Sequence, residues 1–141
     1  MRTVLRQALS LVLLALVPAA ASAFFHPKRP AWKSDEITLA TTRSWRENVL
    51  WVDARAQADF EKAHIPGAVL LNENTWDELL LDVLRAAPGR ALVVYCSSSR
   101  CQSSHEVARR LRDEVGLPHV YVLRGGWEAW LDEQRLNAQQ K

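Results

Sequence analysis

The sequence predicts an α/β domain whose sheet is mainly parallel and is covered by helices on both faces. Short apolar runs alternate along the chain with segments of helical periodicity. The run Ala91–Tyr95 is apolar without interruption, which is typical of a central strand buried on both faces. A helical segment separates each pair of neighbouring runs, as the crossover connections of parallel strands require. A length of 141 residues fits one such domain.

Five short apolar segments are the expected strands. They are, in order, Ile37–Leu39, Val49–Val52, Ala68–Leu71, Ala91–Tyr95 and His119–Leu123. Pro66-Gly67 and Pro88-Gly89 are the expected turns, and Gly116 with Pro118 is the expected stop of the helix before the last strand.

Helical periodicity predicts a helix after each of these strands. The segments are, in order, residues 41–48, 56–63, 75–86, 103–115 and a last helix from Trp127. Thr75, with Glu78 three residues later, predicts a capping box for the third helix. Ser103 or Ser104 is the expected N-cap of the fourth. The polar end of the last helix, 131–141, is expected to fray.

The first 23 residues have the pattern of a secretory signal peptide. Arg2 and Arg6 precede a long uncharged run that ends in the small residues Ala21-Ser22-Ala23. Pro18 interrupts the run, which favours cleavage after these small residues over retention as a membrane anchor. We therefore expect a periplasmic or secreted protein, attached to a membrane only if residues 1–23 are not cleaved.

The mature domain is expected to be formally neutral. Without Arg2 and Arg6, the 18 Lys and Arg fall to 16, which equals the 16 Asp and Glu. A neutral chain gives no general attraction to phosphate backbones, so we expect no nucleic-acid partner. Residues 24–36 are rich in proline and mixed in charge and are the expected arm or linker, and residues 37–141 the expected domain.

The only two cysteines lie in the stretch YCSSSRCQSS, between a buried strand and a helix. Cys96 directly follows the strand, at the sheet edge where parallel α/β domains bind ligands. A curved loop of small residues directs amide groups inward, and the helix N-terminus and Arg100 add positive charge. These surroundings favour a thiolate and suit a nucleophilic sulfur, or a sulfur that carries a second sulfur. The alternative, that Cys96 is only a small buried apolar residue, does not account for three consecutive serines.

Five motifs follow one another along the chain. They are Val52-Asp53-Ala54-Arg55, Phe60, His64-Ile65-Pro66-Gly67-Ala68, Val93-Val94-Tyr95-Cys96 and Leu123-Arg124-Gly125-Gly126-Trp127-Glu128-Ala129-Trp130. In this order and spacing, from about Ile37 to Leu131, they resemble a single rhodanese-like domain. The resemblance implies a five-stranded parallel sheet and a loop from Cys96 to Cys101 that cradles a persulfide. It also implies that Cys96 accepts sulfane sulfur from a small donor and passes it to a thiol acceptor or partner protein.

The loop departs from the usual pattern of that family at two positions. Ser99 stands where glycine is frequent, and Cys101 stands where a basic or small residue is frequent, which argues against thiosulfate as the donor. Cys101 is the expected resolving thiol, which would attack a persulfide on Cys96 and leave a disulfide, or else the second half of a redox couple. A disulfide requires Cα atoms within roughly 4.4–6.8 Å of each other, so the loop geometry decides.

Substrate binding is assigned to the rest of the loop and to one residue near it. Ser97, Ser98, Ser99 and Arg100 are the expected loop contacts. Arg55 follows a neighbouring strand at the same sheet edge and is expected to steer an anionic donor. The alternative for Arg55 is that it ties down neighbouring loops together with Asp53.

Three other functions are weighed against sulfur transfer. A phosphatase loop needs arginine six places after the cysteine, where this chain has Gln102, so that chemistry is excluded. Cys96, Cys101 and His105 lack the paired spacing of a metal site, and we expect no metal and no cofactor. A non-catalytic binding module with the same fold is the third alternative, and the cysteine at the first loop position argues against it.

Overall fold

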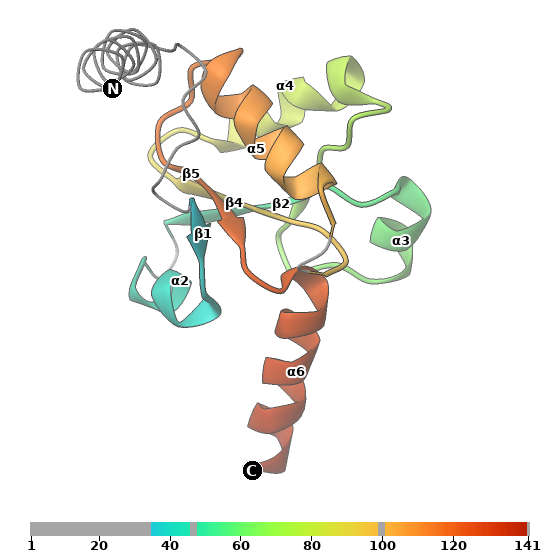
Figure 1. Cartoon of the computed structure of the whole chain (residues 1–141), viewed down its shortest axis with the longest axis vertical. Coiled ribbons are helices and arrows are strands. Elements are labelled where there is room, and N and C mark those ends of the chain that lie inside the picture. Colours follow the sequence, from blue (N-terminus) through green and yellow to red (C-terminus); the bar gives the residue numbers. More distant parts are fainter. Residues whose placement is uncertain (1–34, 46–47, 99–100, 141) are drawn as a thin grey trace, which may run out of the picture. The chain divides into compact units, whose positions relative to one another are not determined.

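The computed structural model describes residues 35–45, 48–98 and 101–140. They form a five-stranded, all-parallel sheet with strand order β1-β5-β4-β2-β3 (Figure 1). The strands are β1 (Glu36–Ile37), β2 (Val49–Asp53), β3 (Val69–Leu70), β4 (Ala91–Tyr95) and β5 (Val120–Leu123). The helices are α2 (Leu39–Trp45), α3 (Gln57–Lys62), α4 (Trp76–Ala86), α5 (Ser103–Asp113) and α6 (Gly126–Gln139). The predicted fold class is confirmed.

Strand β4 is the centre of the sheet and is buried on both faces. Leu92 and Val94 pack with α4 and α5, whereas Val93 and Tyr95 pack with aromatic side chains of α2 and α6. Figure 1 shows these two pairs of helices on opposite faces of the sheet. The uninterrupted apolar run in the sequence reflects this double burial.

The register of the central strands brings their carboxyl ends level. Asp53 of β2 lies opposite Tyr95 of β4, and the Ala54 amide donates to the Tyr95 carbonyl at 2.8 Å. The segments that follow, which begin with Ala54-Arg55 and with Cys96, therefore leave the sheet at the same edge.

Several expected boundaries and caps are wrong. Leu39 begins α2 rather than ending a strand, and α6 continues to Gln139. Gln102, not a serine, is the N-cap of α5. No capping box forms before α4, because the Asn72 side chain accepts the Thr75 amide at 3.1 Å and the Thr75 hydroxyl at 3.0 Å. Asn72 is buried, and its carbonyl oxygen organises the turn before α4 instead.

The expected signal peptide and nearly all of the expected arm, residues 1–34, lie outside the described residues. In the part of the chain that the structure describes, no helix has both the length and the apolar character that crossing a membrane requires.

Truncation of a core leucine tests the packing of α5 on the sheet. Leu111 is fully buried, whereas Leu81 on α4 is 52% exposed. Leu111→Ala should lower the free energy of unfolding in urea by about 2–5 kcal/mol, because it leaves a cavity against β4 and β5. Leu81→Ala is the matched control and should cost less than about 1 kcal/mol. Equal losses in the two variants would contradict the packing described here.

Candidate active site

Cys96 is the first residue after β4, and the loop that follows returns to it. Cys96 is 4% exposed and is joined to Cys101 by a disulfide, with the two Cα atoms 6.1 Å apart. This separation lies within the range that a disulfide requires. The Cys101 amide donates to the Ser98 carbonyl at 3.2 Å, so the chain reverses direction just before α5 begins. The two thiols predicted to act together are therefore brought together.

The start of α6 holds the loop. The Trp127 amide donates to the Cys96 carbonyl at 2.7 Å, and the Glu128 amide donates to the Ser97 carbonyl at 3.2 Å. In a trans peptide the N–H group points opposite to the C=O group. The N–H groups of Ser97 and Ser98 therefore point opposite to the two carbonyls that α6 binds.

Gly126 allows this close approach of α6 to the loop. Its φ is +56°, and a Cβ atom at this position would collide with the Cys96 carbonyl and lie 3.2 Å from the Ser98 nitrogen. The sequence predicted no contact of Gly126 with the cysteine loop. The signal that could have indicated it is the pair of glycines one residue after β5.

The remaining predicted loop contacts divide into two groups. Ser97 is exposed and Ser98 is half-buried, and both belong to the loop backbone that α6 holds. Ser99 and Arg100 lie outside the described residues. The N-terminus of the 11-residue helix α5 follows at Ser103 and adds partial positive charge beside the disulfide.

Arg55 is buried in an ion pair and does not present its guanidinium to solvent. Its Nε and one terminal nitrogen donate to both oxygens of the Asp53 carboxylate at 2.6–3.1 Å, and that terminal nitrogen also donates to the Ala63 carbonyl at 2.7 Å. Burial opposes the charge, but the hydrogen bonds and charge of Asp53 outweigh it and raise the pKa of Arg55. This geometry fits the alternative in which Asp53 and Arg55 tie loops together.

Trp127 links this ion pair to the cysteine loop. The Arg55 guanidinium lies 4.6 Å from the centre of the Trp127 ring and 5.6 Å from that of Tyr95. The Tyr95 hydroxyl accepts the Ile65 amide at 3.2 Å, and burial raises the pKa of Tyr95 well above its ordinary value. Trp127 thus contacts the buried charge with its side chain and the Cys96 carbonyl with its backbone.

The residues weighed as a metal site are otherwise engaged. Cys101 precedes the first turn of α5, so it does not share a helical face with His105. The His105 ring lies 3.3 Å from the Glu36 carboxylate, which also accepts from Arg124 at 3.2 Å. Within the described ranges, no group of three or more His, Cys, Asp or Glu residues is placed to hold a metal ion.

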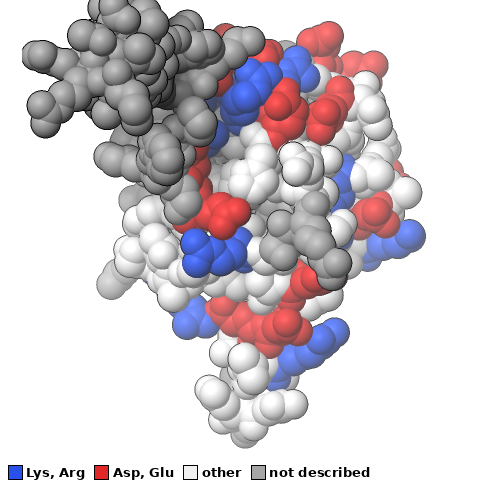
Figure 2. Space-filling model, viewed as in Figure 1, with Lys and Arg blue, Asp and Glu red and all other residues white. Residues whose placement is uncertain are grey.

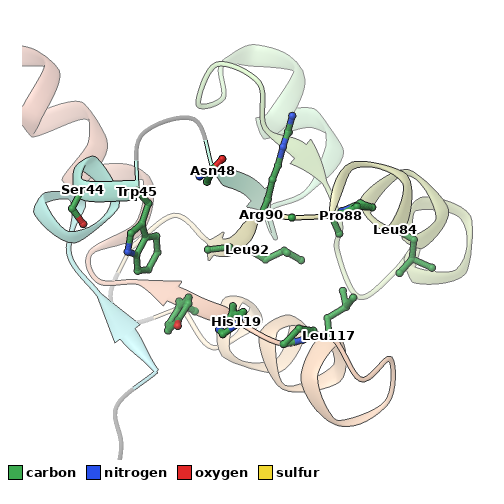
Figure 3. Close-up of a pocket in the computed structure, with 14 residues that line it drawn as sticks. Ser44, Trp45, Asn48, Leu84, Pro88, Arg90, Leu92, Leu117 and His119 are labelled. Carbon is green, nitrogen blue, oxygen red and sulfur yellow. The ribbon is translucent and has the colours of Figure 1, made fainter.

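A cavity of about 730 Å³ lies at the other edge of the sheet, where β4 begins. Figure 3 shows Leu92 between Trp45 on one side and Leu84 and Leu117 on the other. His119, whose φ is +58°, also lines it. Because strands β4 and β5 run away from this cavity toward the cysteine loop, the cavity is separate from the candidate active site.

Charges of both signs are intermixed on the face of the molecule that Figure 2 shows. Charges of both signs also pair along α5 and its C-cap, where Arg109 donates to Glu106 at 2.7 Å and to Glu114 at 3.0 Å.

This protein is a parallel α/β protein whose two cysteines lie in a loop at the carboxyl end of the central strand. The rhodanese-like domain family matches residues 37–133. The chain therefore belongs to the rhodanese-like domain family. Among curated proteins the chain has no match.

Solved structures share the fold at low sequence identity. A Bacillus halodurans protein is 24% identical with a TM-score of 0.59, covering 70% of this chain and 72% of that one. A rhodanese-related protein from Thermoplasma volcanium is 16% identical with a TM-score of 0.54, covering 70% and 91%. The As–Sb reductase from Leishmania major is 23% identical with a TM-score of 0.54, covering 70% and 77%. These similarities show the fold alone.

Alanine at the first residue of α6 tests the contact between helix and loop. Gly126→Ala should destabilise the protein by about 3 kcal/mol, because it adds a collision with the Cys96 carbonyl to the cost of a positive φ. Gly89→Ala, also at positive φ but with open space around it, should cost only about 1–2 kcal/mol. Urea unfolding measures both variants, and equal losses would show that the loop contact does not constrain position 126.

Removal of the buried carboxylate tests the Asp53–Arg55 pair. Asp53→Ala should cost about 3–5 kcal/mol, because it leaves the Arg55 guanidinium buried without its counter-charge. Asp82→Ala removes an exposed ion pair with Arg85 and should cost less than about 1 kcal/mol in the same assay. A loss below about 1 kcal/mol for Asp53→Ala would contradict the structural role given to the pair.

Proposed function

We propose that this protein carries sulfane sulfur as a persulfide on Cys96, with Cys101 as the resolving thiol. The observation that carries the proposal is the position of Cys96 in a loop whose carbonyls are held by α6, with a second thiol in disulfide contact. Membership of the rhodanese-like family supports it. The signal-like pattern of residues 1–23 supports a periplasmic or secreted location for the proposed activity.

The chemistry follows from nucleophilic displacement at sulfur. In the reduced protein, the Cys96 thiolate attacks the sulfane sulfur of a small donor such as a polysulfide, and the donor's S–S bond breaks with release of a thiolate. The Ser97 and Ser98 amides and the start of α5 stabilise the negative charge on sulfur. A thiol acceptor or a partner protein then takes the outer sulfur.

Cys101 gives the persulfide a second fate. Its thiolate attacks the Cys96 sulfur, the persulfide S–S bond breaks, and hydrosulfide leaves. The product is the Cys96–Cys101 disulfide found in this structure, and a reductant must open it before the next cycle. In this scheme no cofactor is required, because each step is an exchange between sulfur atoms.

The disulfide itself favours a second candidate function. A dithiol–disulfide redox protein would use the same two residues and would exchange electrons with a partner without carrying sulfur. A binding module with this fold would do neither. The three functions differ in what they predict for variants of each cysteine.

Single cysteine variants separate these functions. After reduction and exposure to polysulfide, the wild-type protein should carry cyanolysable sulfur, and Cys96→Ser should carry none, because Cys96 holds the persulfide. Cys101→Ser is the matched control: it should keep the persulfide longer than the wild type, because no resolving thiol is present. The amount and lifetime of the persulfide are read as thiocyanate released by cyanide and by mass spectrometry.

Each alternative has its own signature in that experiment. If Cys96→Ser takes up as much sulfur as the wild type, the proposed carrier is wrong. If the protein is a dithiol–disulfide redox protein, none of the three proteins carries a persulfide. Turnover with a dithiol partner is then lost in both cysteine variants. A binding module shows no sulfur chemistry in any of the three proteins.

A further inference from the structure

The two sulfurs of the disulfide differ in their access to solvent. Cys96 is 4% exposed and follows Tyr95, which is fully buried at the end of β4. Cys101 is half-buried, at the outer end of the loop, and the next residue, Gln102, is exposed. The Cys96 end of the bond thus lies at the packed end of β4, and the Cys101 end is partly exposed.

The difference in exposure between Cys96 and Cys101 matters because a thiolate must approach a disulfide from a particular direction. An incoming thiolate approaches the attacked sulfur along the S–S axis, from the side opposite to the sulfur that leaves. An approach to Cys96 would have to reach the sulfur of a residue that is only 4% exposed, at the packed end of β4. An approach to Cys101 comes from its partly exposed side.

The leaving group also favours attack at Cys101. If Cys101 is attacked, the departing thiolate is Cys96, which directly precedes the Ser97 and Ser98 amides in the loop that α6 holds. Exchange is faster when the departing thiolate is better stabilised. If Cys96 were attacked, the charge would appear on Cys101, after the turn closed by the bond from its own amide to Ser98.

We propose that a thiol reductant opens the disulfide by attacking the Cys101 sulfur, so that Cys101 is the docking residue and Cys96 is released as the free thiolate. The first thiolate of a dithiol partner bonds to Cys101, the Cys96–Cys101 bond breaks, and its electron pair goes to Cys96. The second thiol of the partner attacks the first partner sulfur, and Cys101 leaves as a thiolate that takes up a proton. The partner ends as a disulfide, and the protein has gained two electrons.

The step gives Cys101 a role before sulfur transfer as well as after it. In the disulfide, the Cys101 sulfur occupies the bond on Cys96 that the outer sulfur of a persulfide would occupy. Reduction by attack at Cys101 breaks the Cys96–Cys101 bond and leaves the Cys96 thiolate free to react with a sulfur donor. In this respect the inference rests on the proposed function, in which Cys96 is the sulfur carrier.

The sequence provides a direct way to locate the attacked sulfur. Arg90, Arg100 and Arg109 allow trypsin to separate the two cysteines into peptides 91–100 and 101–109. The oxidised protein is mixed with glutathione, quenched early with acid, alkylated with N-ethylmaleimide and digested. Glutathione should be found on the Cys101 peptide, and maleimide on the Cys96 peptide, in at least about tenfold excess over the reverse pattern. Equal labelling, or an excess of glutathione on Cys96, would overturn the inference.

The same protein unfolded in guanidinium chloride, with its disulfide intact, is the matched control. In the unfolded protein, the amounts of glutathione on the Cys101 and Cys96 peptides should be within about threefold of each other, because the burial of Cys96 and the contact with α6 are lost. A tenfold preference that persists in the unfolded chain would assign the effect to the local sequence and overturn the structural explanation.

A parallel sample separates this inference from the proposed function. Reduced protein is exposed to polysulfide, and peptide 91–100 is examined for an added sulfur. Glutathione on Cys96 together with a persulfide on Cys96 overturns only the inference. Glutathione on Cys101 without any persulfide supports the inference and overturns the proposed function.

Discussion

Two backbone hydrogen bonds from the start of α6 hold the loop that carries both cysteines. Trp127 and Glu128 donate to the carbonyls of Cys96 and Ser97, and the planar trans peptide then turns the following amides to the other side of the loop. A site that stabilises a sulfur anion needs amides in that direction. The position of α6 therefore constrains how the peptide groups after Cys96 and Ser97 are oriented.

The position of α6 depends in turn on a buried ion pair and on two glycines. Arg55 is neutralised by Asp53, lies against the Trp127 ring and donates to the carbonyl of Ala63 after α3. The pair thereby joins the ends of β2, α3 and α6 under the loop. Gly125 and Gly126 adopt positive φ values of 79° and 56°, which lets the chain turn from β5 into α6 without a Cβ atom against Cys96.

The disulfide gives the two cysteines different chemical positions. Cys96 is fixed at the packed edge of the sheet, whereas Cys101 lies at the accessible end of the loop. A partly exposed electrophilic sulfur and a buried leaving group are the arrangement expected of a bond that a partner thiol opens in one direction. The apolar cavity at the amino edge of the sheet has no part in this chemistry, because it lies where β4 begins and the cysteines lie where β4 ends.

The sequence by itself determined the alternation of strands and helices, the double burial of Ala91–Tyr95 and the place of Cys96 after that strand. These features follow from local periodicity and from turn residues, which each segment carries independently of the others. Only the tertiary structure decided the strand order, the closure of Cys96 on Cys101, the burial of Arg55 against Asp53 and the contact of α6 with the loop. The physical reason is that these are contacts between surfaces distant along the chain, or the closure of an irregular loop. A periodic pattern specifies which face of a segment is apolar, but not which neighbour covers it or where a backbone amide points.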